Sequence, residues 1–372
     1  MIDEESIQGY QTPTPKVESV DGDHLSAFCG DDIPALGSAV AIESETEETC
    51  FAVVERHSGA RRIDLWLPGA PDWIQTGTPI RPTHKPAGFA RPQSESLTTG
   101  ADLFRPLQQG DIILWPDAPK MMELDGKRPA LGLGLDALDT LAPIARGGVN
   151  LIINAADDVE LFSRLASRTL AQIEPATSLL ATSSDVRPAP ETKVFRIDPS
   201  ASHYDNIAAL QIVIALGAVL RHSGTSVALV DLPRLRQTGY EPPDLSAPAF
   251  GLPQIIDRLG RHLVSTTDGS ITTILHLRIA DELQGLSDII ETLHLGDVDS
   301  LIYIDSHGRF DPERSTSRAD IDDATDSRRH NDLQTLSLAR RAREKSAIFG
   351  EHDLDPAEKK ALETVEALRP KL

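Results

Sequence analysis

The pattern of apolar and polar positions changes along the chain and marks regions of different character. Residues 24–85 contain short runs rich in β-branched and aromatic residues, separated by Gly, Asp and Ser-Gly turn signals. Closely spaced short strands of this kind are typical of a small β-barrel or β-sandwich. In residues 131–322, strand-like apolar runs alternate with helical periodicity. That alternation predicts a parallel sheet covered by helices.

The central region holds the clearest individual elements. Apolar runs predict buried strands at residues 150–153, 193–197, 226–232, 271–277 and 300–304. Apolar spacing of helical type predicts helices at residues 158–170 and 207–222. The most apolar run, residues 207–220, includes Gln211 and is shorter than the roughly 20 residues that a membrane-spanning helix needs. We therefore expect a buried helix there and no insertion into a membrane.

The C-terminal region is predicted to be helical. A first helix is indicated by apolar residues that fall near one stripe: Leu333, Leu336, Ala339, Ala342 and Ala347. Gly350 follows as a stop signal. Asp355, Pro356 and Glu358 then mark the start of a second helix, because a capping residue, a proline in the first turn and a later glutamate favour initiation.

Prolines separate the first two regions. They recur between residues 84 and 130 with little periodicity, at Pro86, Pro92, Pro106, Pro116, Pro119 and Pro129. Proline at this density interrupts regular elements. The predicted organisation is a β-barrel domain at 1–88, a Pro-rich linker at 89–130, an α/β domain at 131–322 and a helical domain at 323–372.

Composition narrows the choice of partners. The chain has 36 Lys and Arg against 57 Asp and Glu, a net charge of −21, and only 4% aromatic residues. Nucleic acid and anionic membranes both need positive surface, and single-stranded nucleic acid also needs aromatic stacking platforms. No nucleic-acid partner is therefore expected.

Signatures of common catalytic and metal sites are missing from the sequence. It contains no HExxH, GxSxG, GxGxxG or EF-hand pattern, and its 11 histidines have no metal-ligand spacing. We expect no metal site. Cys29 and Cys50 are too few for a structural zinc site; a disulfide is one alternative, and two reduced thiols in the cytoplasm is the favoured one. The acidic first residues differ from a secretory signal, so a cytoplasmic location is expected.

Residues 134–148 (GLDALDTLAPIARGG) carry the most specific pattern. They resemble the run that leads into the nucleotide site of the alpha and beta subunits of rotary (F-type) ATP synthases, G-[IL]-x-x-[IVL]-D-x-L-x-P-x-x-[RK]-G. Flagellar and type III secretion ATPases share this run, and the transcription terminator Rho is more distant. The resemblance implies an N-terminal small β-barrel, a central RecA-like nucleotide-type domain with a parallel sheet, and a C-terminal helical tail.

Further segments resemble the same family in the same order. They are residues 75–82 (QTGTPIRP) at the end of the barrel, 226–232 (SVALVDL), 269–272 (GSIT), 311–318 (DPERSTSR) and the helical segment 338–357. In the family, the strand matched by 226–232 carries an aspartate that holds magnesium through water, and Asp231 stands in that place. Arg318 stands where the family has an arginine finger that reaches into a neighbour's site, or its beta-subunit counterpart.

The phosphate loop is the main departure from the family. The family's G-x-x-x-x-G-K-T falls on residues 154–161 (NAADDVEL) without a gap. Asn154 and Val159 replace the two glycines, Glu160 replaces the lysine, and Leu161 replaces the hydroxyl residue. A phosphate loop needs those glycines for its backbone, the lysine for charge and the hydroxyl for magnesium. ATP and magnesium are therefore expected not to bind at this position, and no cofactor is expected.

Charge magnitudes support that expectation. A pair of unit charges about 4 Å apart is worth roughly 4 kcal/mol at an effective dielectric constant near 20. Replacing lysine by glutamate reverses that contribution, whereas a micromolar site has only about 8 kcal/mol in total. Residues 179–190 (LLATSSDVRPAP) stand where the family's segment with the catalytic glutamate is expected.

For Asp231 and Arg318 the sequence leaves two alternative roles open. Asp231 without its magnesium partner is interpreted as a buried or strand-end aspartate, with magnesium binding as the lesser alternative. Arg318 is interpreted equally as a finger supplied to a partner's nucleotide site or as the partner of a salt bridge to Asp320, Asp322 or Asp323.

The sequence thus favours a non-hydrolysing relative of rotary ATPase alpha and beta subunits. Its expected role is structural or regulatory, within a hexameric ring or docked on related alpha/beta-like subunits, and peripheral to a membrane only through these partners. The alternative is an active subunit of an ion-translocating ATP synthase whose Arg318 completes a partner's site. A Rho-like nucleic-acid motor is a third hypothesis, which the acidic charge disfavours.

Overall fold

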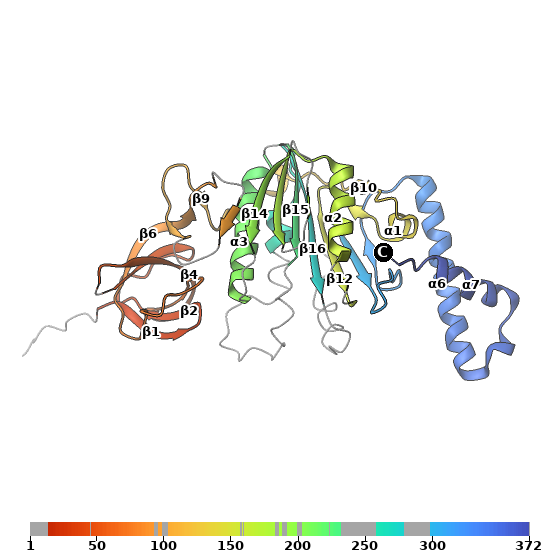
Figure 1. Cartoon of the computed structure of the whole chain (residues 1–372), viewed down its shortest axis with the longest axis horizontal. Helices are drawn as coiled ribbons and strands as arrows, with labels where there is room; N and C mark the ends of the chain where they lie inside the picture. The colour runs from red at the N-terminus through yellow and green to blue at the C-terminus, as the bar shows by residue number, and fades with distance from the viewer. Residues whose placement is uncertain are drawn as a thin grey trace, which may run out of the picture. The chain divides into compact units, whose positions relative to one another are not determined.

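The computed structural model describes residues 14–44, 46–92, 96–98, 103–156, 158, 160–182, 186–187, 192–198, 203–222, 224–231, 258–278 and 298–371. The chain forms two compact units, one of residues 1–93 and 98–116 and the other of residues 94–97 and 117–372. Figure 1 shows a β-rich first unit, a second unit with a central sheet, and a helical hairpin at the C-terminal end of the second unit.

The first unit is an antiparallel sheet. Its strands are β1 (Lys16–Asp21), β2 (His24–Phe28), β3 (Ser38–Glu43), β4 (Thr49–Gly59), β5 (Arg62–Trp66), β6 (Ile80–Phe89), β8 (Arg105–Pro106) and β9 (Ile112–Ile113). The strand order is β1-β2-β5-β4-β3-β6-β8, and β9 pairs with β6. Val17 in β1 also bonds to the segment just before β6, since its N–H donates to the Thr78 carbonyl (2.9 Å) and its carbonyl accepts from the Gly77 N–H (2.8 Å).

Alternating apolar side chains give this unit its own core, which includes Ile63 and Leu65. Both cysteines belong to it as free thiols, Cys29 fully buried and Cys50 nearly so. Burial raises the pKa of the Cys29 thiol, which keeps it in the less reactive protonated form at neutral pH.

The stretch expected to be a linker, residues 89–130, contains short elements. Besides β8 and β9 these are β7 (Ser96–Thr98), the 3-10 turn η1 (Met121–Glu123) and the first residue of β10 (Ala130–Leu131). Prolines keep these elements short because each removes a backbone donor.

The second unit is built on a mostly parallel sheet. Its strands are β12 (Val149–Asn154), β13 (Thr177–Thr182), β14 (Lys193–Asp198), β15 (Thr225–Asp231), β16 (Ser270–Arg278), β17 (Ser300–Ile304) and the antiparallel β18 (Thr316–Ser317). The order is β18-β17-β12-β16-β15-β13-β14-β7. A small β10–β11 pair, with β11 at Ile144–Ala145, precedes β12.

Helices cover both faces of the parallel sheet. The helices are α1 (Asp136–Leu141), α2 (Glu160–Ile173) and α3 (His203–Leu220). Phe162 of α2 stacks on His276 of β16. On the same strand, Ile271 points to the opposite face, where it approaches Gly217 of α3. Successive strand residues face opposite sides, so both faces are buried, as the continuous apolar strands require.

All five strands predicted for the central region are present, with ends that differ by at most one residue. The predicted helices correspond to α2 and α3. The prediction missed β13, because residues 179–182 were assigned to a segment replacing the family's catalytic one. In the structure they are buried and pair with β14 and β15.

The C-terminal part is helical, with α6 (Asp323–Phe349), the 3-10 turn η3 (Glu351–Asp353) and α7 (Pro356–Ala367). Asp355 and Glu358 form the predicted capping box of α7, and Gly350 ends α6. The predicted apolar stripe of α6 is only partly buried. Leu336, Ala339 and Ala342 are buried, whereas Leu333 and Ala347 are exposed.

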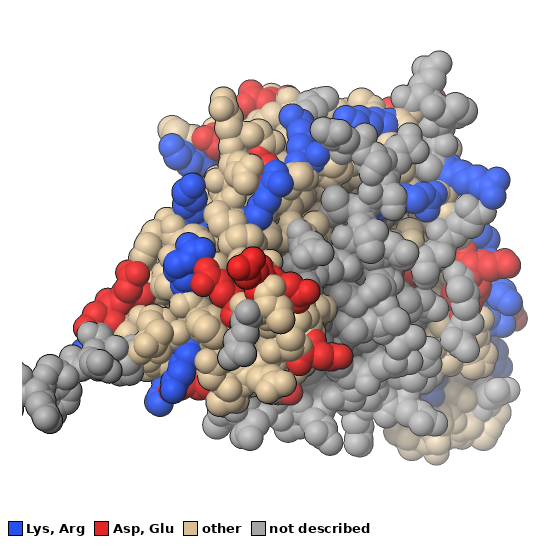
Figure 2. Space-filling view, turned by 60° about the vertical axis from the view of Figure 1, so that its left-hand side comes forward, with Lys and Arg blue, Asp and Glu red and all other residues tan. Residues whose placement is uncertain are grey.

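The surface carries charges of both signs. Figure 2 shows acidic and basic side chains interspersed over the face drawn. Exposed ion pairs in the first unit include Arg81 with Glu43 (2.8 Å) and Arg62 with Glu18 (2.8 Å). Among the helices that the structure describes, none is long and apolar enough to cross a membrane.

Candidate functional site

Polar side chains gather where three adjacent strands of the parallel sheet end. Asn154 is the last residue of β12 and Asp231 the last of β15, and His276 lies near the end of β16 between them. Asp231 pairs in register with His276, which pairs in register with Ile152. Ligands of open α/β sheets bind outside the carboxyl ends of the strands, so this edge is the candidate site.

The three polar side chains form a continuous buried array. His276 Nδ1 lies 3.0 Å from Asp231 Oδ1, and His276 Nε2 lies 3.3 Å from Asn154 Nδ2. The side chains of His276 and Asp231 are 0% and 1% exposed. Burial at this level is unusual for an aspartate unless it is paired. The side chains of Asn154, Asp231 and His276 at the carboxyl ends of these strands therefore hydrogen-bond to one another within the protein.

Helix α2 packs directly on this array. The Phe162 ring stacks on the His276 imidazole with centroids 5.2 Å apart and planes 19° from parallel. Phe162 and Leu161 are both almost fully buried in the core of the second unit. Asn154 Oδ1 accepts the N–H of Ala156 (3.0 Å), which lies two positions after the end of β12.

The amino end of α2 is capped by the protein's own carboxylate. Asp158 Oδ1 accepts the backbone N–H groups of Glu160 (2.9 Å) and Leu161 (3.2 Å), and Asp158 Oδ2 accepts from Arg164 Nη2 (2.6 Å). The first amides of a helix are the groups that bind phosphate in a phosphate loop. Here these two amides already have an anionic partner.

Opposing effects set the ionisation of this cap. Burial pushes the pKa of Asp158 upward, while hydrogen bonds from Arg164 and from the Glu160 and Leu161 amides push it downward. The net result is a pKa below the usual value for aspartate. The cap is therefore ionised at neutral pH, which is the form that interacts best with the positive end of the helix dipole.

The other positions predicted to correspond to the family's nucleotide site differ in their exposure to solvent. The Glu160 side chain is 86% exposed, with Arg164 Nη1 at 3.6 Å. Leu161 points into the core and is 1% exposed. Val159 lies outside the described residues. A metal would need several free donors, and the described residues contain no group of three or more His, Cys, Asp or Glu side chains placed to hold one.

Arg318 lies beyond the short strand β18 and is exposed. Its backbone N–H donates to the Asp299 carbonyl (2.8 Å). The expected alternative of a salt bridge is not seen in the described part of the chain. The Asp320 carboxylate accepts the Arg128 N–H, and the Asp322 carboxylate accepts the Thr325 N–H at the start of α6.

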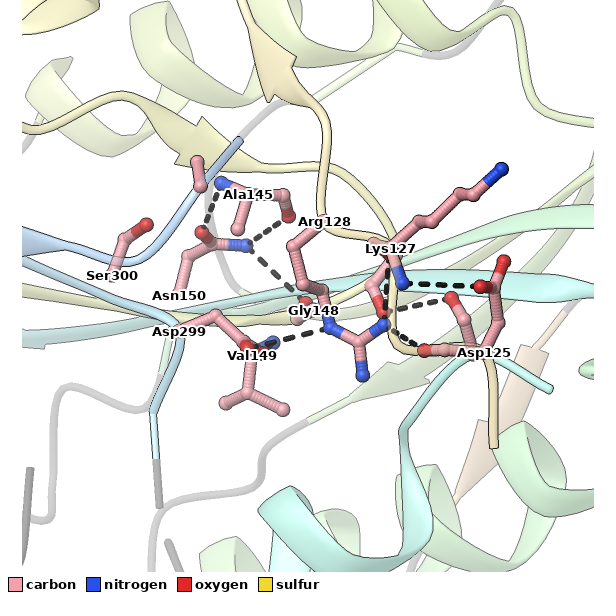
Figure 3. Close-up of polar contacts among 12 residues, drawn as sticks. Asp125, Lys127, Arg128, Ala145, Gly148, Val149, Asn150, Asp299 and Ser300 are labelled. Atoms are coloured by element: carbon pink, nitrogen blue, oxygen red, sulfur yellow. Dashed lines mark hydrogen bonds and ion pairs between the residues drawn. The ribbon is translucent and has the colours of Figure 1, made fainter. Parts of the chain in front are cut away.

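A second polar network lies at the opposite, amino end of β12 (Figure 3). Asn150 Oδ1 accepts the Ala145 N–H (2.7 Å), and its Nδ2 donates to the Ala145 carbonyl (3.1 Å). The same Nδ2 also donates to the Thr273 carbonyl (3.1 Å). Asp299 accepts the Val149 N–H (2.8 Å). These bonds satisfy buried backbone groups, and they join β11, β12 and β16.

Residues of the family-like motif belong to this structural framework. Asp139 accepts the N–H groups of Leu133 (2.9 Å) and Leu135 (3.0 Å), which fixes the turn before α1. A Cβ at Gly148 would lie 2.3 Å from an Asp299 carboxylate oxygen. The motif therefore organises the entry into β12 and contributes no free side chain to the candidate site.

The sequence reasoning missed His276 and the capping role of Asp158. The spacing of the 11 histidines along the sequence does not distinguish His276 from the others. Its signal was its position in an otherwise apolar strand, ILHLR, at residues 274–278. Asp158 was placed inside the helix, although an aspartate just before an apolar helical pattern is the ordinary sign of an N-cap.

The chain was also compared with models of known protein families, and none of them matches it.

Proposed function

We propose that this protein is a non-catalytic relative of rotary ATP synthase alpha and beta subunits, serving as a structural or regulatory component of a ring or related assembly. Its proposed partners are other alpha/beta-like subunits. The observation that carries the proposal is the Asp158 carboxylate on the first amides of α2. A strand–loop–helix unit of nucleotide-binding type is kept, while its anion site is occupied by the chain itself.

The fold supports the resemblance at the level of architecture. The β12–α2 unit lies in a parallel sheet, as a RecA-like domain requires, and α6 and α7 correspond to the helical tail. For the N-terminal barrel, the support is the bonding of Val17 to Gly77 and Thr78, together with the Lys16–Pro79 bridge. These contacts join the first strand to the start of β6 and are the kind that closes a barrel.

Three features act together against a nucleotide. Asp158 supplies negative charge at the helix end, Glu160 adds a second carboxylate, and Leu161 offers no hydroxyl because its side chain is in the core. A phosphate would have to displace the Asp158 cap and then approach two carboxylates. At about 4 Å and an effective dielectric constant near 20, repulsion from the mostly buried Asp158 carboxylate costs roughly 4 kcal/mol, whereas solvent screens the repulsion from the exposed Glu160 carboxylate to about 1 kcal/mol or less.

Isothermal titration calorimetry with Mg-ATP tests whether the full chain binds nucleotide. The full chain should give no binding heat at micromolar nucleotide, whereas micromolar affinity would refute the proposal. An alpha/beta subunit with an intact phosphate loop, titrated in the same buffer, is the positive control. Assembly is tested separately by co-expression with alpha- and beta-like chains, followed by native mass measurement. Recovery of the chain only as a free species would remove the ring assignment.

One observation favours the alternative of an active assembly. The Arg318 side chain is exposed and forms no ion pair within the described residues, although the protein has an excess of carboxylates. An arginine supplied in trans stabilises the charge of phosphoryl transfer and is worth about 10³–10⁵ in kcat. An assembly with Arg318→Ala should then lose activity on that scale. The exposed neighbour Arg314, changed to alanine, is the matched control and should keep it.

A further inference from the structure

We propose that Met121 and Met122 are a reversible oxidation site, at which peroxide converts two thioethers to sulfoxides while the fold stays intact. The two residues belong to η1 in the second unit. They are separate from the polar array at the carboxyl ends of the strands. This inference does not depend on the proposed function, since it rests on where the chain places its sulfur atoms.

Methionine sulfur lies on the surface of this protein and cysteine sulfur lies inside it. Met121 and Met122 are 90% and 85% exposed, although methionine is among the residues most often fully buried. Cys29 is 0% exposed and Cys50 is 4% exposed. The third methionine, Met1, lies outside the described residues. Within the described part of the chain, the exposed sulfur-containing side chains are therefore one adjacent methionine pair.

Backbone hydrogen bonds hold the turn that carries the pair. The Glu123 N–H donates to the Lys120 carbonyl (2.8 Å), and the Glu123 carboxylate accepts the Lys120 N–H (3.0 Å). The Glu123 carbonyl accepts the Thr267 N–H (3.0 Å), and the Asp125 N–H donates to the Ser265 carbonyl (3.0 Å). None of these bonds uses a methionine side chain, so the turn keeps them when the sulfur atoms are oxidised.

Peroxide oxidises a thioether by transfer of one oxygen atom. A lone pair of the methionine sulfur attacks one peroxide oxygen, so that an S–O bond forms and the O–O bond breaks. The other oxygen leaves as hydroxide and takes up the proton of the transferred oxygen, which releases one water. Sulfur loses two electrons and hydrogen peroxide gains them. Methionine sulfoxide reductases reverse the change, because two thiols supply the electrons, form a disulfide and release the oxygen as water.

The buried thiols should react with the oxidant more slowly than the methionine pair. The thiolate is the reactive form of cysteine, and burial raises the pKa of the Cys29 thiol. Its S–H group also donates to the Arg61 carbonyl (3.2 Å). Cys50 is buried in the same core. A thioether has no proton to lose, so its reactivity follows its exposure to the oxidant and not its ionisation.

Oxidation at this place changes the surface and leaves the core as it is. A sulfoxide is polar, and it disrupts packing when it forms in a core or in an apolar interface. Met121 and Met122 bury little of their surface, so little packing is lost. Two apolar side chains on the outer face of η1 become polar instead. The modification is therefore a reversible change in surface polarity.

The first test treats the full-length native protein with hydrogen peroxide at neutral pH. Peptide mass mapping should show one added oxygen on each of Met121 and Met122, while thiol labelling after unfolding still finds both cysteines reduced. Reductases specific for the two sulfoxide epimers should then remove both oxygens. Loss of the thiols before the methionines are oxidised, or failure of the reductases to act on the native protein, would refute the proposal.

A buried methionine provides the matched control. Leu336 is 4% exposed, and cores tolerate a change from leucine to methionine because the volume is nearly conserved. In the Leu336→Met protein, position 336 should acquire oxygen only after unfolding in urea, whereas Met121 and Met122 should react in the native state. Equal rates at the three positions would show that exposure does not direct the reaction, which overturns the proposal.

A second test asks whether the fold tolerates the modification. The urea midpoints of peroxide-treated and untreated wild-type protein should coincide. A variant that combines Met121→Leu with Met122→Leu, treated in the same way, distinguishes these two sulfoxides from oxidation elsewhere. A midpoint that falls in the wild type and not in this variant would mean that the two side chains are packed in solution, which contradicts a surface site.

Discussion

Asp158 shows how one side chain can change what a helix end does. The amides of Glu160 and Leu161 are the kind of donors that bind anions, and the carboxylate of Asp158 satisfies both. Arg164 then balances the charge of that carboxylate with a 2.6 Å bond. The local chemistry is that of an N-cap, which stabilises the start of α2 and leaves both amides bonded within the chain.

Asp158→Ala should therefore destabilise the second unit. An N-cap removed by alanine costs typically about 1 kcal/mol, with a range of about 0.5–2 kcal/mol. Asp158→Asn is the matched control, because asparagine keeps a capping oxygen and should retain most of the stability at neutral pH. Urea denaturation followed by far-UV circular dichroism measures both, and equal losses would contradict the capping role.

The same cap predicts a pH dependence. The pKa of Asp158 is lowered in the folded state, so its carboxylate contributes stability that is fully present above the unfolded pKa of about 3.9. That contribution is lost as pH falls through the folded pKa. The stability difference between the wild type and Asp158→Ala should then be full at pH 7 and shrink below about pH 4. A difference that stays constant down to pH 2.5 would argue against an ionised cap.

Gly269 lies very close to the backbone of a neighbouring segment in the second unit. A Cβ at this position would lie 1.9 Å from the Arg221 carbonyl oxygen and 2.9 Å from that of Gly224. Because both obstacles are backbone atoms, they cannot rotate away. Gly269→Ala should cost about 1–3 kcal/mol or more, the range for forced overpacking. Gly126→Ala, where a Cβ meets nothing within 4 Å, should be close to neutral in the same thermal unfolding experiment.

At the scale of elements, α6 is a long helix that buries only a few of its side chains against the rest of the protein. Only Leu336, Ala339 and Ala342 are buried on it. Leu336 and Ala339 pack with residues of α7 and of the sheet in one core. The capping box at Asp355 and Glu358 fixes where α7 begins. The hairpin is therefore stabilised by one apolar face and by its caps, because its other faces are charged and exposed.

Comparing a buried and an exposed leucine on α6 distinguishes the effect of burial on stability from that of helix propensity. Leu336 is 4% exposed and Leu333 is 44% exposed. Leu336→Ala should cost about 2–5 kcal/mol, as for other buried leucines, whereas Leu333→Ala should change stability by less than about 1 kcal/mol. Chemical denaturation of the two variants checks this. Similar losses for both would mean that Leu333 is buried in solution.

Most elements could be predicted because their signals are local. The apolar run that became β15 and the cap that starts α7 both act within a few residues. The strand β13 could not be recognised, since TSLLAT is short and mixes hydroxyl with apolar side chains. Its identity depends on its neighbours β14 and β15, which lie later in the chain.

At the scale of the whole molecule, each unit has a separate apolar core. Leu65 belongs to the core of the first unit and Leu165 to that of the second. Units with their own cores can unfold independently. The domain boundary near residue 116 depends on strands β8 and β9, which pair with β6.

Paired core variants test that independence. Leu65→Ala should lower the stability of the first unit by about 2–5 kcal/mol and leave the second unchanged, and Leu165→Ala should do the reverse. Site-resolved hydrogen exchange during urea unfolding distinguishes the two. A single transition shifted equally by both variants would show that the units unfold as one.

The sequence by itself determined the order of the regions, the α/β alternation and the residue types at 154–161, which lack the glycines, the lysine and the hydroxyl that a phosphate loop needs. These follow from local periodicity and from residue identity, since no packing can turn Glu160 into a lysine. Only the tertiary structure decided which contacts the residues of this region make. It brought Asn154, Asp231 and His276 together from strands separated by long stretches of chain, and it placed Asp158 on the amides of α2. Hydrogen-bond partners depend on strand order and register, which local patterns do not encode.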